Sequence, residues 1–149
     1  MSAQVSEIKV SYHDSNVPLM HHKITSSADA AEVLFSHWDD GTIQLRESFK
    51  IVLLNNSNGI KGIFEISNGG ITGTLVDLRI LFAVILKSLT VGIILTHNHP
   101  SGQLKASASD KAITRKIKKA ADLFDIKLLD HIILAPNCSY YSFADEGIL

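Results

Sequence analysis

The stretch Thr96-His97-Asn98-His99-Pro100-Ser101-Gly102, followed by Ser107-Ala108-Ser109-Asp110, is the part of the chain around which the fold is organised. An uninterrupted apolar run over residues 91–96 precedes the histidines and predicts a buried strand. Residues 107–124 follow, with apolar side chains at the spacing of an amphipathic helix. The proline, serine and glycine between them predict a turn. The segment therefore predicts a strand, a turn and a helix.

The two histidines stand at the end of the predicted strand, two positions apart, so both imidazoles project from one side and Asn98 from the other. The first turn of the following helix can bring Asp110 back across the loop. Two imidazoles and a carboxylate are a common ligand set for catalytic zinc, whereas magnesium favours oxygen ligands. His97, His99 and Asp110 are therefore candidate zinc ligands with an open fourth position. A second interpretation stays open, in which Ser107 and Asp110 only cap the helix.

Apolar patterns on both sides of this segment predict the remaining elements. Residues 49–54 are apolar on both faces, which predicts an internal strand, and the helix over 77–89 is apolar almost all round, which predicts deep packing. The order of elements predicts an α/β fold, a single-domain mixed β-sheet flanked by helices. Residues 1–24 are expected to form an N-terminal strand and connector, and residues 25–149 the domain. The full set comprises helices over 28–38, 77–89 and 107–124 and strands over 7–12, 47–54, 60–67, 91–96, 127–134 and 139–143.

Composition limits the classes of function. The 149 residues include 14 basic and 15 acidic side chains, for a net charge of −1, which argues against a dedicated nucleic-acid binder. One cysteine allows no internal disulfide, and neither a signal peptide nor an apolar run near the ~20 residues of a membrane span is evident. We therefore expect a cytoplasmic protein. A basic stripe on the predicted helix could contact DNA phosphates, steer an acidic partner or be an ordinary solvated face; it consists of Lys111, Arg115, Lys118 and Lys119.

Two other kinds of active site fit the sequence poorly. A thiol nucleophile built from Cys138, Asp130 and His131 is disfavoured, because the adjacent Asp130 and His131 diverge on a strand. These two residues are instead expected to contribute hydrogen bonds beside the histidine site. A zinc deaminase needs His-x-Glu and Pro-Cys-x-x-Cys, whereas this chain has His-x-His and a single cysteine.

The spacing His97-x-His99-x₇-Ser107-x₂-Asp110 resembles the JAMM motif of the JAB/MPN metalloprotease superfamily at all four positions. The amino-acid sequence is similar to that of the RadC branch of this superfamily at residues 69–74, 94–102 and 129–133. The resemblance covers roughly residues 25 to 149. Longer RadC proteins carry a helix–hairpin–helix region before this domain, and this chain is not expected to hold one.

The resemblance implies a JAB/MPN fold, related to that of cytidine deaminases, with zinc held by His97, His99 and Asp110. It implies that Ser107 helps stabilise a tetrahedral intermediate and that a glutamate from an early strand is the general base. Glu47, ahead of a phenylalanine and an apolar run, is the preferred candidate, and Glu65 on the next predicted strand is its rival.

The implied function is a zinc-dependent metallohydrolase, a JAMM-type peptidase or isopeptidase in which activated water attacks an amide carbonyl. The alternative is a RadC-like DNA-repair or DNA-transaction accessory module with a structural or vestigial metal site. The peptide or protein substrate is not readable from the sequence. A membrane partner is not expected.

Overall fold

The computed structural model describes residues 5–7, 9, 11, 23–69 and 75–149. The strand predicted over residues 7–12 lies in part outside the described residues, and residues 7, 9 and 11 are not in regular structure. Most of the connector before residue 24 and most of the glycine-rich segment over 69–74 also lie outside them. Within the described part of the chain, no helix is long and apolar enough to cross a membrane.

A mixed five-stranded sheet forms the centre of the molecule, as predicted. Its spatial order is β2-β1-β3-β4-β5, and among the neighbouring strands of the described residues only β3 and β4 pair in parallel. The parallel pair is joined through a helix, which is the usual crossover for parallel strands. The strands are β1 (Ser48–Leu54), β2 (Ile60–Asn68), β3 (Gly92–Asn98), β4 (Lys127–Leu134) and β5 (Tyr140–Ser142).

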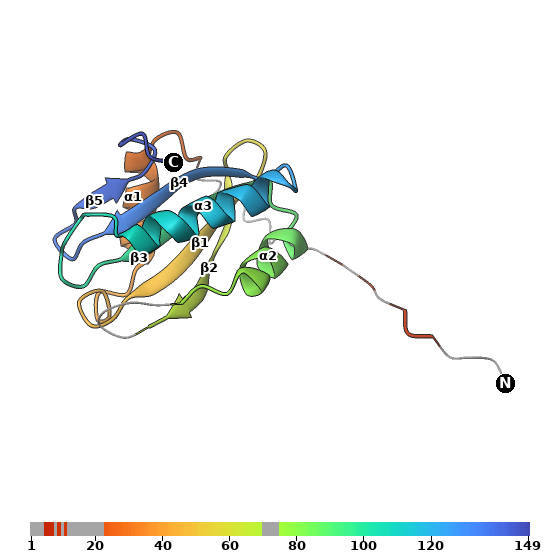
Figure 1. The fold of residues 1–149 in the computed structure, drawn as a ribbon, viewed down its shortest axis with the longest axis horizontal. Coiled ribbons are helices and arrows are strands. Elements are labelled where there is room, and N and C mark those ends of the chain that lie inside the picture. The colour runs from red at the N-terminus through yellow and green to blue at the C-terminus, as the bar shows by residue number, and fades with distance from the viewer. Residues whose placement is uncertain (1–4, 8, 10, 12–22, 70–74) are drawn as a thin grey trace.

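Helices cover both faces of this sheet, which confirms the predicted layers (Figure 1). One apolar cluster joins α1 (Ser27–His37) to one face, and another joins α2 (Leu78–Lys87) and α3 (Ala108–Asp122) to the opposite face. The side chain of Ser26 accepts a hydrogen bond from the backbone of Asp29, and this N-cap starts α1 at Ser27, one residue before the predicted start.

The internal strand β1 is buried on both sides, as its sequence predicts. Phe49, Ile51 and Leu53 pack in the cluster with α2 and α3, while Val52 and Leu54 pack in the cluster with α1. All five side chains are buried. This burial agrees with its place between β2 and β3.

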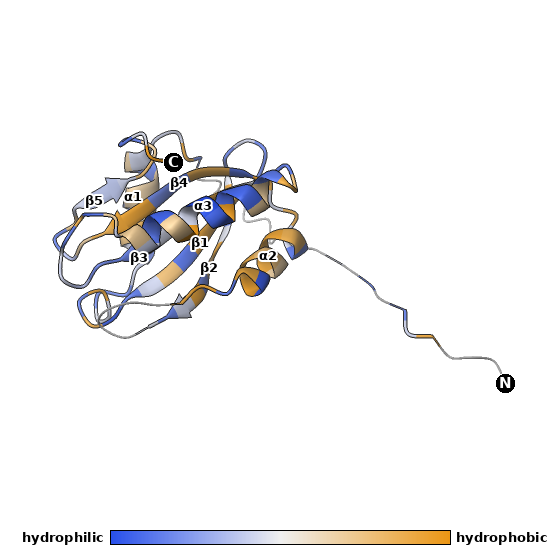
Figure 2. Cartoon of the chain, viewed as in Figure 1, coloured by the Kyte–Doolittle hydropathy of each residue, from blue (hydrophilic) through white to orange (hydrophobic). Residues whose placement is uncertain are grey.

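Helix α2 is less buried than its composition predicts. Only Leu81 and Ile85 are fully buried, whereas Ile80 is 47% exposed and Leu86 is 44% exposed. Figure 2 shows α2 as hydrophobic over much of its length. The physical reason is that a helix lying on one face of a sheet buries a single stripe, and no described element packs over the outer side of α2. The expectation of deep packing all round is therefore wrong.

Strand β3 is longer than predicted, because it continues past Thr96 to Asn98. The backbone of His97 pairs with Phe49 of β1 and with Ile133 of β4. The first histidine of the motif therefore lies inside the sheet, where its imidazole is almost completely buried.

Candidate metal centre

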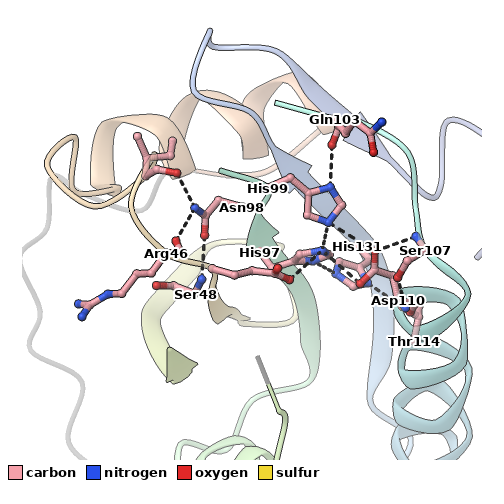
Figure 3. A network of polar contacts seen from close by, with 12 residues as sticks. Arg46, Ser48, His97, Asn98, His99, Gln103, Ser107, Asp110, Thr114 and His131 are labelled. Carbon is pink, nitrogen blue, oxygen red and sulfur yellow. Dashed lines mark hydrogen bonds and ion pairs between the residues drawn. The ribbon is translucent and has the colours of Figure 1, made fainter. Parts of the chain in front are cut away.

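Four potential ligand side chains converge at the end of β3: Glu47, His97, His99 and Asp110. Their ligand atoms all lie within 4.8 Å of one another. The two histidines come from the end of β3, Asp110 from the first turn of α3, and Glu47 from the residue before β1. Figure 3 shows the histidines and Asp110 directed toward one another. The structure thus brings together the three predicted ligands and the preferred glutamate.

The distances within this group suit a small metal ion. The Nε2 atoms of His97 and His99 lie 2.9 Å apart. His97 Nε2 lies 3.3 Å from Asp110 Oδ1, and His99 Nε2 lies 3.5 Å from Asp110 Oδ2. Ligand atoms around one tetrahedral zinc ion are about 3.3–3.6 Å apart, given zinc–ligand distances of about 2.0–2.2 Å. The two histidine–aspartate distances lie within this range, and the two imidazole nitrogens lie closer together than it. Two imidazole nitrogens and a carboxylate fit zinc in their chemistry.

Asp110 is held in place by the start of α3. Its Oδ2 atom accepts a hydrogen bond of 2.8 Å from the backbone N–H of Ser107, and its own N–H donates to Ser107 Oγ at 3.0 Å. This reciprocal pair is a capping box. The helix cap and the candidate ligand are therefore compatible, since Asp110 Oδ1 still faces His97. The Ser107 hydroxyl only accepts in this pair, so its own proton is available to another acceptor.

The two glutamates that compete for the role of general base occupy different places. Glu47 Oε1 lies 3.8 Å from His97 Nε2, and the Glu47 side chain is only 13% exposed. Glu65 is exposed on β2, where it accepts a hydrogen bond from the Asn68 side chain. The cluster of potential ligands includes Glu47 and does not include Glu65.

Asn98, the residue between the two histidines, holds the backbone around Glu47. Its fully buried side chain donates to the carbonyl oxygens of Ile43 and Arg46 at 2.8 and 2.9 Å. Its Oδ1 atom accepts from the N–H of Ser48 at 2.8 Å (Figure 3). Two of these partners are the neighbours of Glu47 in the chain. The alternation of β3 predicts that Asn98 points away from the histidines, but sequence analysis did not find its role.

Charge and burial shift the pKa values of the group in different directions. Burial raises the pKa of Glu47, with Asp110 acting in the same direction and His97 and His99 opposing it. The hydrogen bond with Asp110 raises the pKa of His99, although burial opposes this shift. Burial alone would raise the pKa of Asp110, but hydrogen bonds from the two histidines hold it well below its usual value. The metal-free site therefore favours an aspartate anion beside a readily protonated histidine.

A third histidine lies behind the first. His131 on β4 is fully buried, and its Nε2 atom is 2.8 Å from Nδ1 of His97. Burial lowers the pKa of His131 well below its usual value. Its other nitrogen, Nδ1, is 2.6 Å from the hydroxyl of Thr114 on α3. The expectation that His131 hydrogen-bonds beside the site agrees with this contact; Thr114 was not identified from the sequence.

Asp130 faces away from the histidines and holds the end of β5 and the segment that follows it. Its carboxylate accepts hydrogen bonds from the hydroxyl of Ser142 and from the backbone N–H groups of His131 and Ala144. Burial raises its pKa, and these hydrogen bonds oppose the shift. Cys138 is exposed in the turn before β5, with a positive φ of 63°, and forms no group with Asp130 and His131.

Three of the four side chains in the basic stripe on α3 are exposed, and the fourth donates a hydrogen bond within the protein. Lys118 donates to the carbonyl oxygen of Leu149 at 3.2 Å, whereas Lys111, Arg115 and Lys119 are exposed. These three lie four residues apart, on one side of the helix.

Comparison with known proteins places these features in a family. A family model described as a RadC-like JAB domain matches residues 24–148. A UPF0758 protein of Flavobacterium johnsoniae is 46% identical over 126 residues, which is 85% of this chain and 53% of the relative. UPF0758 proteins of Porphyromonas gingivalis and Alkaliphilus metalliredigens are 39% and 35% identical, covering 70% and 87% of this chain and 46% and 54% of their own lengths. The chain thus spans about half the length of these relatives.

Proposed function

This chain belongs to the RadC-like JAB domain family, and we propose that it is a zinc-dependent hydrolase that cleaves a peptide or isopeptide bond. The observation that carries the proposal is the convergence of Glu47 on His97, His99 and Asp110. Three ligands and one partly buried carboxylate make up the minimum machinery for metal-assisted amide hydrolysis. Peptidase chemistry is what the resemblance to the JAMM motif implies.

His97 and His99, through their Nε2 atoms, and Asp110 would hold the zinc ion. The Nδ1 atom of His99 lies 2.6 Å from the carbonyl oxygen of Gln103, which can only accept a hydrogen bond, so His99 donates from Nδ1 and its Nε2 faces the group. Bound zinc supplies a Lewis acid that polarises a carbonyl and makes water a usable nucleophile near neutral pH. Glu47 lies beside these three residues, with its Oε1 atom 3.8 Å from His97 Nε2.

Glu47 is proposed as the general base and then the general acid. Its carboxylate would accept the proton of the attacking water and return it to the leaving amine. The raised pKa of Glu47 suits both steps, because it makes the carboxylate a stronger base toward the proton of water, while the protonated carboxyl group can still donate to the more basic leaving amine. The hydrogen bonds of Asn98 on either side would fix the backbone that presents this carboxylate.

Ser107 is proposed to stabilise the tetrahedral oxyanion. Its hydroxyl accepts the hydrogen bond of the helix cap, which orients the oxygen and leaves the proton to be donated. A single donor of this type contributes about 10²–10³ in kcat.

The test is a cleavage assay with purified protein on a mixture of unstructured peptides and isopeptide-linked peptides, with and without a chelator. Cleavage should require zinc. Glu47→Gln should keep bound zinc and lose activity by about 10²–10⁴, the usual contribution of general acid–base catalysis, whereas Glu65→Gln should leave activity unchanged. A Glu65→Gln variant as impaired as Glu47→Gln would contradict the assignment of the base. Chelator-insensitive cleavage would contradict the metal mechanism.

A second candidate function is a DNA-transaction accessory role in which the metal group is structural. The exposed Lys111, Arg115 and Lys119, close behind Asp110 on α3, favour a phosphate contact. Binding of duplex DNA that weakens steeply between 50 mM and 200 mM salt, without any peptide cleavage, would support it. Removal of two of these charges should then lower the slope of affinity against salt by about two.

A further inference from the structure

A chain of short hydrogen bonds runs behind the candidate ligands and connects two of them. His97 Nδ1 contacts His131 Nε2 at 2.8 Å, and His131 Nδ1 contacts Thr114 Oγ1 at 2.6 Å. Thr114 Oγ1 lies 2.6 Å from the backbone carbonyl oxygen of Asp110. Figure 3 shows these side chains between β3, β4 and α3. His97, Thr114 and His131 are all buried, so no solvent contact replaces any of these bonds.

Counting the available protons shows which atom donates in each of these hydrogen bonds. Each of the three contacts in this series of hydrogen bonds needs one proton between its two electronegative atoms; the 2.9 Å contact between the Nε2 atoms of His97 and His99 lies outside the series, at the candidate metal position. The carbonyl oxygen of Asp110 has none to give, so the single hydroxyl proton of Thr114 must point to it. The proton in the next contact must then come from Nδ1 of His131.

The position of the ring proton on His97 follows from the position of the ring proton on His131. A neutral imidazole carries one proton, so His131 with a proton on Nδ1 has a lone pair on Nε2. A doubly protonated His131 would be a fully buried cation, which is strongly disfavoured. The proton between His131 Nε2 and His97 Nδ1 therefore belongs to His97, whose Nε2 is left to face His99 and Asp110.

We infer that Thr114 and His131 are positioning residues that fix the tautomer of His97, so that its Nε2 lone pair is presented to the metal. This inference rests on the metal site of the proposed function. The carbonyl of Gln103 does the same for His99, by accepting from its Nδ1. A carbonyl oxygen can only accept a hydrogen bond, whereas an imidazole nitrogen can either donate or accept. The hydroxyl of Thr114 prevents Nε2 of His131 from becoming the donor to His97, because it accepts from Nδ1 of His131.

The direct test is nitrogen-15 NMR of the imidazoles in metal-free wild-type protein. Both His131 and His97 should carry a proton on Nδ1, and Nε2 of His131 should be unprotonated. A proton on Nε2 of His131 together with an unprotonated Nδ1 of His97 would overturn the inference. The measurement needs neither zinc nor substrate, so it decides the tautomers even if the protein cleaves nothing.

The second test is zinc affinity, measured by competition with a chromophoric chelator, in Thr114→Val and Thr114→Ser. Valine matches threonine in shape but removes the hydroxyl, and zinc should bind about 10–100-fold more weakly, the usual effect of losing a group that orients a ligand. Serine keeps the hydroxyl and should bind as wild type. Equal affinity in all three proteins would overturn the inference, and the wild-type NMR result decides it if Thr114→Val does not fold. Tight zinc binding without amide cleavage would defeat the proposed function and leave the tautomer assignment standing.

Discussion

At the scale of single residues, Asn98 shows how one side chain can serve a site that it does not touch. It lies between the two candidate histidine ligands but points to the other face of β3, where it binds the backbone on both sides of Glu47. A buried amide with three hydrogen bonds fixes that segment more rigidly than apolar packing would. One face of the strand thus carries His97, a candidate metal ligand, and the other face fixes the backbone that presents the proposed base.

We predict that Asn98→Ala lowers the free energy of unfolding by about 1–3 kcal/mol, because a buried N–H group and two carbonyl groups lose their partner. Turnover should fall while zinc affinity changes little, since the displaced group is Glu47 and not a ligand. Urea unfolding, zinc titration and the peptide-cleavage assay check this prediction. Asn68→Ala, at an exposed asparagine on β2, is the control and should change none of the three quantities. A loss of zinc affinity as large as the loss of turnover would contradict this role.

We predict that Asp130 makes stability fall as pH rises. Burial raises its pKa in the folded protein, so between the unfolded value of about 3.9 and the raised folded value the native state binds more protons than the unfolded state. The stability of wild type relative to Asp130→Asn should therefore be greatest near pH 4 and decline toward pH 7. Urea unfolding at several pH values checks the slope. Asp122→Asn, at an exposed carboxyl group, is the control, and a rising relative stability for wild type would contradict the sign.

The candidate ligands could be found from the sequence because their spacing is local: His97, His99 and Asp110 lie within fourteen positions. Thr114, His131 and Asn98 could not be assigned in the same way. Their partners are set by strand register and by backbone atoms, which carry no signal in the residue types. Of these three roles, only that of His131 was anticipated, by the expectation that it hydrogen-bonds beside the histidine site.

At the scale of elements, the start of α3 combines a helix cap with a ligand. Ser107→Ala should lower the free energy of unfolding by about 1 kcal/mol, the usual cost of losing a serine N-cap. It should also weaken zinc binding, because the capping box orients Asp110. Thermal unfolding and zinc titration of the variant check both effects. Ser107→Thr keeps a capping hydroxyl and is the matched control; equal loss in both variants would show that the cap is not the cause.

Helix α2 gives a second prediction at this scale. Leu81→Ala should lower the free energy of unfolding by about 2–5 kcal/mol, because Leu81 is fully buried against the sheet. Leu86→Ala, a matched change on the exposed side of the same helix, should cost within about 0.5 kcal/mol. Urea unfolding of both variants measures the difference. Similar losses would mean that another part of the protein or a partner covers the outer side of α2.

Most element positions followed from apolar periodicity, including both faces of β1. The deep packing expected for α2 is not observed. An apolar composition indicates how much surface a helix could bury, but the neighbouring elements determine how much of that surface is covered. The end of β3 was set two residues early, since His97 and Asn98 are polar and yet pair within the sheet.

At the scale of the whole molecule, the site depends on the order of the strands. Antiparallel pairing of β1 with β3 places Phe49 opposite His97, and so brings Glu47 to a histidine fifty positions further along the chain. The parallel β3–α3–β4 unit brings Asp110 and His131 to the same place. The fold class was predictable from the order of elements. The approach of Glu47 to His97 was expected only from the family resemblance, because it depends on the register between β1 and β3.

The most direct measurement of the central claim is the zinc content of the purified protein after zinc loading and dialysis, determined by mass spectrometry of the metal. The wild-type chain and Glu47→Gln should each retain one zinc ion per molecule, because Glu47 is proposed as a base and not as a ligand. The variant that combines His97→Ala with Asp110→Ala should retain none, while circular dichroism confirms that it is folded. Undiminished zinc content and affinity in that folded double variant would contradict the metal centre described above.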